Sequence, residues 1–154
     1  MNRSILSIDP SGTGTTALCL INEESVAFAE IKNKDWKEHL NFIVNYIQQN
    51  KPDQLIYEHT NYINLHGKDM TSLFKLFGAI ECLTFFFTLA INNIPVNQVK
   101  DLYQKLYQGR EKLTDLTYQA GRGKGWTFQG KRISIHQLDA FLVYWIWRKH
   151  QEKK

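Results

Sequence analysis

Short apolar runs alternate with longer amphipathic stretches along this chain. Five runs have the length of β-strands and are bounded by polar residues, Gly or Pro; they span residues 4–9, 15–21, 26–31, 54–58 and 94–99. Short polar connections join the first three runs, which predicts an antiparallel meander.

The longer stretches have apolar residues at helical spacing. The predicted helices are 35–50, 69–92, one or two within 100–119 broken near Gly109, and 134–147. Ser134 and Gln137 have the spacing of a capping box at the start of the last helix. Residues 121–132 are rich in Gly and basic residues, so we expect a loop or a small hairpin there, and a fraying tail after 147. Alternating strands and helices predict the α/β class, a mixed sheet covered on both faces.

Composition adds limits to this picture. The 154 residues fit one domain, residues 1–154, and a net charge of +4 favours an acidic partner such as a nucleic acid. Cys19 and Cys82 stand among apolar residues, so we expect two buried thiols and neither a disulfide nor a cysteine zinc site. The most apolar window, 76–91, is interrupted by Glu81, and the N-terminus lacks a signal-peptide pattern. These features predict a cytoplasmic protein without membrane spans.

Acidic residues occupy corresponding places in the predicted elements. Asp9 ends the first strand and Glu58 ends the fourth, so the two lie side by side if these strands are parallel neighbours. Asp139 falls in the first turns of the last helix, on the same helix face as His136. Each residue alone has an ordinary explanation, as a turn former, a surface acid or a first-turn helix residue. Their matching positions favour one joint site.

Crowded carboxylates repel one another unless a cation lies between them. Carboxylate oxygens suit Mg²⁺, with Mn²⁺ as a substitute, and two such ions about 4 Å apart can promote phosphodiester hydrolysis. A basic chain with such a cluster therefore suggests a metal-dependent nuclease.

An ordered set of short motifs resembles the RuvC family of Holliday junction resolvases, in the ribonuclease H-like superfamily. The motifs are Ile8-Asp9-Pro-Ser-Gly, Tyr57-Glu58, Leu76-Phe-Gly-Ala79, Pro95-Val-Asn-Gln-Val-Lys100 and Ile135-His-Gln-Leu-Asp139-Ala140. Each is weak alone, but together they cover nearly the whole chain in the family's order. The compact chain is most similar to phage or small-genome versions.

The resemblance implies a ribonuclease H-like five-stranded sheet, three antiparallel strands followed by two parallel ones. It implies Asp9, Glu58, His136 and Asp139 as catalytic and metal-binding residues, Mg²⁺ as cofactor, and nicking of branched DNA in recombination or repair. It also implies a homodimer, for which the apolar helix 69–92 is our candidate interface, in a bacterial cell or a phage-infected host.

Basic residues cluster late in the chain, where they predict phosphate contacts. We expect DNA contacts from Lys100, Arg110, Lys112, Arg122, Lys124, Lys131 and Arg132, of which Lys100 and Lys112 resemble basic positions of the family. Trp126 and Phe128 either stack on unpaired bases or anchor their loop on the core. The family often inserts an aromatic residue shortly after the second carboxylate; here Tyr62 is the candidate, one place later than expected.

Three other functions stay open. The stretch from Asp9 to Thr16 also resembles the first phosphate loop of actin-like and sugar-kinase folds, which predicts a nucleotide-binding phosphotransferase. A non-catalytic junction-binding protein would keep the basic residues without needing the acidic set. An RNA-processing nuclease is the third, because sequence does not reveal discrimination at the 2′-hydroxyl.

Overall fold

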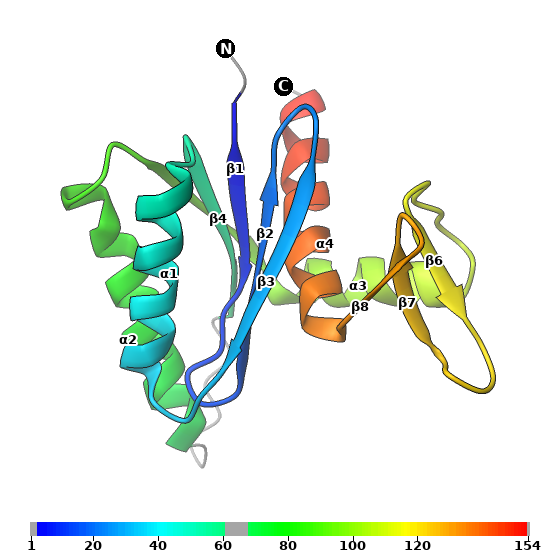
Figure 1. The fold of residues 1–154 in the computed structure, drawn as a ribbon, viewed down its shortest axis with the longest axis horizontal. Helices are drawn as coiled ribbons and strands as arrows, with labels where there is room; N and C mark the ends of the chain where they lie inside the picture. Colours follow the sequence, from blue (N-terminus) through cyan, green and yellow to red (C-terminus); the bar gives the residue numbers. More distant parts are fainter. Residues whose placement is uncertain (1–2, 61–67, 154) are drawn as a thin grey trace.

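The computed structural model of the chain describes residues 3–60 and 68–153, and its centre is a five-stranded mixed sheet. Its strands are β1 (Ile5–Asp9), β2 (Thr15–Ile21), β3 (Val26–Lys32), β4 (Gln54–His59) and β5 (Ala90–Pro95). The strand order is β3-β2-β1-β4-β5, with β1, β2 and β3 antiparallel and β4 and β5 parallel to β1 (Figure 1). The predicted α/β class and strand arrangement are confirmed.

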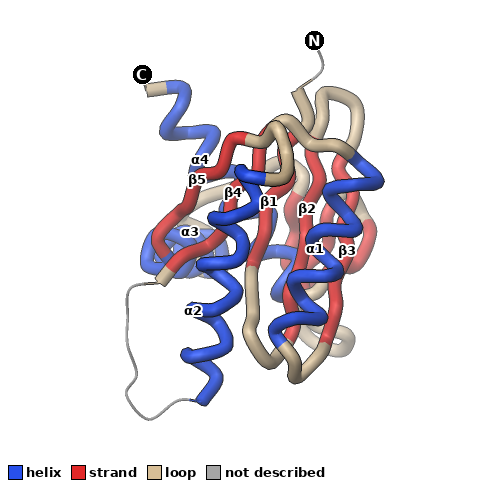
Figure 2. The backbone as a smooth tube through the Cα atoms, turned by 90° about the vertical axis from the view of Figure 1, so that its left-hand side faces the viewer, coloured by secondary structure: helices blue, strands red, loops and turns tan. Residues whose placement is uncertain are grey.

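Helices cover both faces of this sheet, as expected. Helices α1 (Trp36–Asn50) and α2 (Lys68–Glu81) lie on one face, seen towards the viewer in Figure 2, and α4 (Ile135–Glu152) packs on the other. β1 is buried from both sides, because Leu6 and Ile8 join the α1–α2 core whereas the Ser7 hydroxyl donates a hydrogen bond to the Ala140 carbonyl of α4.

The predicted helix over 69–92 is wrong beyond Glu81. A 3₁₀ turn (Cys82–Phe85) follows α2, and β5 then pairs with β4 from Ala90 to Pro95. The predicted strand 94–99 is displaced for the same reason, since helix α3 (Val96–Tyr107) begins directly after Pro95. A short apolar run fits helix and strand equally well, and here the pairing with β4 decides.

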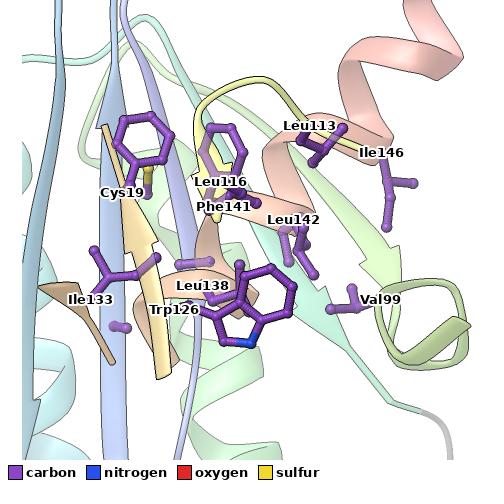
Figure 3. Packing of buried hydrophobic residues seen from close by; sticks show 14 of the residues in the cluster. Cys19, Val99, Leu113, Leu116, Trp126, Ile133, Leu138, Phe141, Leu142 and Ile146 are labelled. Atoms are coloured by element: carbon purple, nitrogen blue, oxygen red, sulfur yellow. The ribbon is translucent and has the colours of Figure 1, made fainter. Parts of the chain in front are cut away.

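A second, three-stranded antiparallel sheet projects from the main body (Figure 1). It consists of β6 (Leu116–Gln119), β7 (Gly125–Phe128) and β8 (Lys131–Ile133), so the predicted helix over 100–119 is wrong after Tyr107. Trp126 and Phe128 of β7 are only 6% and 5% exposed and pack in the same core as α4 (Figure 3). They anchor the small sheet on the core, which is the second of the two alternatives left open by the sequence.

The structure also tests the expectations for the last helix and for the two cysteines. The capping box of Ser134 and Gln137 is present, but α4 continues to Glu152, whose carboxylate contacts Arg148 and Lys149, so the tail after 147 is helical. Cys19 is buried as expected, whereas Cys82 is exposed because α2 ends before it. No helix within the described ranges is long and apolar enough to cross a membrane.

The turn between β1 and β2 lies directly against α2. A Cβ atom added to Gly12 would come within 2.4 Å of the Leu73 nitrogen and 2.6 Å of the Ser72 carbonyl carbon. Both are backbone atoms of a packed helix and cannot move aside without shifting α2. In contrast, a Cβ on Gly78, on the exposed side of the same helix, would meet no atom within 4 Å.

We therefore expect the two glycines to respond to alanine with opposite signs. Gly12→Ala should lower the free energy of unfolding by about 1–3 kcal/mol through overpacking. Gly78→Ala should raise it by about 0.5–1 kcal/mol, because glycine is a poor helix former. Urea unfolding followed by circular dichroism measures both, and equal effects of the two changes would contradict this packing.

Candidate active site

The parallel pairing of β1 and β4 brings the first two acidic residues together. Ile8 lies opposite Tyr57 in this pairing, so the next residues, Asp9 and Glu58, leave the two strands at the same level. Helix α4 begins at this end of the sheet, with Asp139 in its first turns (Figure 1). The fold thus brings together the four residues predicted from the sequence.

Direct contacts link these residues in two groups. His136 Nδ1 lies 3.0 Å from Asp9 Oδ2, and the Asp9 side chain is only 13% exposed. Glu58 and Asp139 line one hollow of about 320 Å³, together with Lys100 of α3. The remaining lining residues are Val96, Val99, Tyr103, Gln104 and Ile135.

Burial and mutual repulsion raise the pKa values of the acids. The pKa of Glu58 rises to about 8, chiefly because burial disfavours its charge and then because Asp9 and Asp139 are near. The pKa of Asp139 rises to about 7 through burial and the charge of Asp9, and that of Asp9 is raised by burial, against the hydrogen bond from His136. The hydrogen bond to Asp9 is the main cause of the raised pKa of His136. The charge of Lys100 lowers the pKa values of Glu58 and Asp139 without cancelling these effects.

The donor set fits a hard divalent cation, because carboxylate oxygens suit Mg²⁺ and Mn²⁺ and a cation would relieve the repulsion. Within residues 3–60 and 68–153, however, no three His, Cys, Asp or Glu side chains stand in an arrangement that could hold a metal ion. Cation binding at this place therefore requires side-chain rotation.

The turn that resembles a phosphate loop already uses two of its backbone N–H groups. The Ser11 nitrogen donates to Thr16 Oγ1 at 2.9 Å, and the Gly14 nitrogen donates to Ser11 Oγ at 2.8 Å. Gly12, between them, is buried against α2. A nucleotide phosphate would need such donors free, so this turn does not favour the phosphotransferase.

The predicted DNA-contacting residues are distributed around two regions. Lys100 is exposed at the acidic hollow, and Lys112 lines a second hollow beside the small sheet. The other exposed members on or near the small sheet are Arg110, Arg122, Lys124 and Lys131. The guanidinium of Arg132 donates to the carbonyl oxygens of Gly123 and Lys124, so it also braces the β6–β7 turn. Tyr62 lies outside the described residues.

Sequence reasoning missed part of the hollow's lining. Tyr103 and Gln104 follow Lys100 by three and four residues, which puts all three on one face of α3. Pro95 before this stretch was the available signal, because proline often precedes or begins a helix. The predicted strand over 94–99 overlaps the start of α3, so the shared helix face was not recognised.

A central strand ending in an acidic residue, with parallel β4 beside it and α4 across it, defines a ribonuclease H-like fold. No protein-family model and no curated protein matches the sequence. Solved structures share the fold, among them two of RuvC and one of YeaZ. RuvC of T. thermophilus in complex with a Holliday junction substrate has a TM-score of 0.63 at 13% identity, covering 96% of both chains. Another Thermus thermophilus RuvC structure has a TM-score of 0.56 at 13% identity, and the match covers 91% of this chain and 90% of that one. YeaZ from Pseudomonas aeruginosa has a TM-score of 0.51 at 11% identity, and the match covers 86% of this chain and 70% of that one.

These comparisons confirm the predicted fold. The identities of 11–13% establish a shared architecture and nothing finer. The ribonuclease H-like sheet expected from the motifs is the sheet observed, over almost the whole length of the chain.

The raised pKa of Glu58 predicts that the metal-free protein loses stability as pH rises. The unfolded chain releases the Glu58 proton near pH 4.5 and the folded protein near pH 8, so the free energy of unfolding falls between these values. At pH 8 in EDTA we expect Glu58→Gln to raise the free energy of unfolding by about 2 kcal/mol, or about 4–8 °C in Tm.

Differential scanning fluorimetry at pH 5 and pH 8 measures this effect. Glu23→Gln, in the exposed turn between β2 and β3, is the matched control and should leave the pH dependence unchanged. A lower Tm for Glu58→Gln at pH 8 would show instead that the carboxylate is favourably paired.

Proposed function

We propose that this protein is a divalent-metal-dependent endonuclease that nicks branched DNA such as Holliday junctions, in recombination, repair or debranching. One observation carries the proposal: three partly buried carboxylates and a histidine converge at the carboxyl ends of β1 and β4, where His136 and Lys100 offset only part of the negative charge. The shared fold with RuvC, which was solved with a Holliday junction, supports the choice of substrate.

In this proposal Asp9, Glu58, Asp139 and His136 hold Mg²⁺ or Mn²⁺, with two ions for each site. When bound, such ions supply an activated water and stabilise the leaving oxygen of the phosphodiester. The chain contributes the charge that attracts the ions and the burial that keeps the carboxylates within reach of them.

The protein's own side chains have further roles. Asp9 Oδ2 fixes the His136 ring through Nδ1, which presents Nε2 as the ring nitrogen that takes up a proton or binds the cation. Lys100, at the rim of the same hollow, offsets the charge of the phosphate next to the acids. The late basic residues Arg110, Lys112, Arg122, Lys124, Lys131 and Arg132 contact the DNA backbone, and Tyr62 inserts at the branch point.

Asp9→Asn tests the nuclease. It replaces a carboxylate by a neutral amide of equal size, so nicking of a synthetic four-way junction with Mg²⁺ should fall by about 100-fold or more. Gel assays should compare four-way junction, Y-fork and linear duplex in Mg²⁺, Mn²⁺ or EDTA. We expect paired nicks in the junction, none in EDTA, and unchanged junction binding by the variant.

Asp101→Asn is the matched control, because this acid is exposed on α3 and pairs with Lys105 outside the hollow. It should nick like the wild type. If the wild-type protein binds the junction but does not nick it in Mg²⁺ or Mn²⁺, the nuclease is rejected and a non-catalytic binding protein is favoured. Equal cutting of all three DNAs would remove junction selectivity, and ATP turnover without DNA would revive the phosphotransferase.

We also propose that the protein acts as a homodimer. Two adjacent phenylalanines, Phe85 and Phe86, are 83% and 79% exposed at the end of the 3₁₀ turn that follows α2, within the stretch 69–92 that the sequence singled out. Side chains of this size gain most when a partner covers them. A symmetric pair of nicks also needs two sites.

Sedimentation velocity tests the dimer. The wild type should sediment with about twice the chain mass of 18.1 kDa. Replacing Phe85 and Phe86 together by Ser removes the apolar contact, so this variant should sediment as a monomer with an unchanged circular dichroism spectrum. A wild-type monomer at all concentrations, or a variant that stays dimeric, would reject this interface.

A further inference from the structure

Four aromatic side chains form a cluster between the acidic hollow and the small sheet, in which each ring contacts two others. Successive ring centroids lie 6.2 Å apart for Tyr103 and Trp126, 5.2 Å for Trp126 and Tyr118, and 5.3 Å for Tyr118 and Tyr107. Tyr103 is itself part of the lining of the acidic hollow. The cluster therefore joins the lining of the candidate active site to the exposed ring of Tyr107.

Tyr107 is the most exposed member of this cluster and is not part of the core. Trp126 is 6% exposed, and Tyr103 and Tyr118 are partly buried against the core cluster. Tyr107 is 57% exposed and belongs to neither core cluster. More than half of Tyr107 therefore remains in water, and packing in the core does not account for this exposed surface.

The ring of Tyr107 is nevertheless held in place. Tyr103, one helical turn earlier on α3, lies nearly parallel to it, at 15° and 6.3 Å between centroids. Tyr118 of β6 contacts it edge to face, at 70°. Two neighbours from different elements thus fix one exposed aromatic surface before any ligand arrives, which reduces the entropy cost of binding.

The charges around this surface suit a nucleic acid. Arg110 follows Tyr107 by three residues and is exposed, and Lys112 lines the adjoining hollow of about 470 Å³ with Tyr118 and Trp126. Lys100 stands in the second turn of α3, seven residues before Tyr107. At 1.5 Å per helical residue this is about 10 Å, or the rise of about three stacked nucleotides.

We propose that Tyr107, held by Tyr103 and Tyr118, is a stacking platform for an unpaired base of the DNA strand, about three nucleotides from the phosphate at the acidic hollow. This rests on the proposed nuclease function and adds a base-binding subsite to it. Aromatic rings stack on any base, so the platform favours locally unpaired DNA without reading its sequence. The flanking Arg110 and Lys112 neutralise the phosphates on either side.

Four variants at one position separate stacking from bulk. Stacking on a base contributes about 1–3 kcal/mol, so Tyr107→Ala should weaken binding of a fluorescein-labelled four-way junction in EDTA by about 5- to 150-fold. Tyr107→Phe and Tyr107→Trp keep an aromatic face and should bind like the wild type. Tyr107→Leu keeps apolar bulk without that face and should bind like the alanine variant.

The salt dependence of binding distinguishes the loss of stacking from a general loosening of the structure. Tyr107→Ala removes no phosphate contact, so the slope of log affinity against log salt should stay that of the wild type. Arg110→Ala should lower the slope by about one phosphate. Gln108→Ala, beside Tyr107 and also exposed, is the control and should change neither affinity nor slope.

Abasic substitutions in the junction complete a thermodynamic cycle. An abasic site at one position within a few nucleotides of the nick should weaken binding by the wild type. The same abasic site should not weaken binding by Tyr107→Ala any further. Wild-type affinity for Tyr107→Ala, or additive effects at every abasic position, would overturn the platform alone. No binding of the junction by the wild type would instead overturn the proposed function, so the two failures are distinguishable.

Discussion

The site depends on the cost of burying carboxylates side by side. Asp9 ends the central strand at 13% side-chain exposure, and its charge raises the pKa values of both Glu58 and Asp139. Uncompensated buried charge is expensive, and the single close partner of Asp9 among the described residues is His136. A fold that retains such a cluster gives up stability locally, which is common where a cation or substrate supplies the missing charge.

The sheet accounts for the position of this cluster. Hydrogen bonding between parallel β1 and β4 fixes Asp9 and Glu58 at one level, and α4 is held across β1 by apolar packing and by the hydrogen bond between Ser7 and Ala140. Rigid, buried elements therefore aim three acids at one place. Apart from Lys100 at the acidic hollow, the basic residues named above lie on or near a separate, smaller sheet anchored by Trp126 and Phe128, so most of them are away from the acids.

Helix α3 connects these two parts. It starts directly after β5, carries Lys100 and Tyr103 past the acidic hollow, and ends at Tyr107 beside the small sheet. A strand of DNA lying along α3 would meet the acids, then aromatic surface, then the cations that follow the helix. In the proposed function this layout gives the three-stranded sheet, which packs into the same core as α4, a role in binding DNA.

The local sequence determined the elements whose patterns fit only a strand or only a helix. The first three strands, the helix over 35–50 and the capping box at Ser134 follow from alternation, helical spacing and cap chemistry, and the acidic residues could be singled out because each stands at the end of such an element. Only the tertiary structure decided the rest. Residues 82–99 are apolar enough for helix or strand, and pairing with β4 selected a turn, a strand and then α3. Trp126 and Tyr107 are both aromatic residues near basic ones, and only packing buries the first and leaves the second exposed.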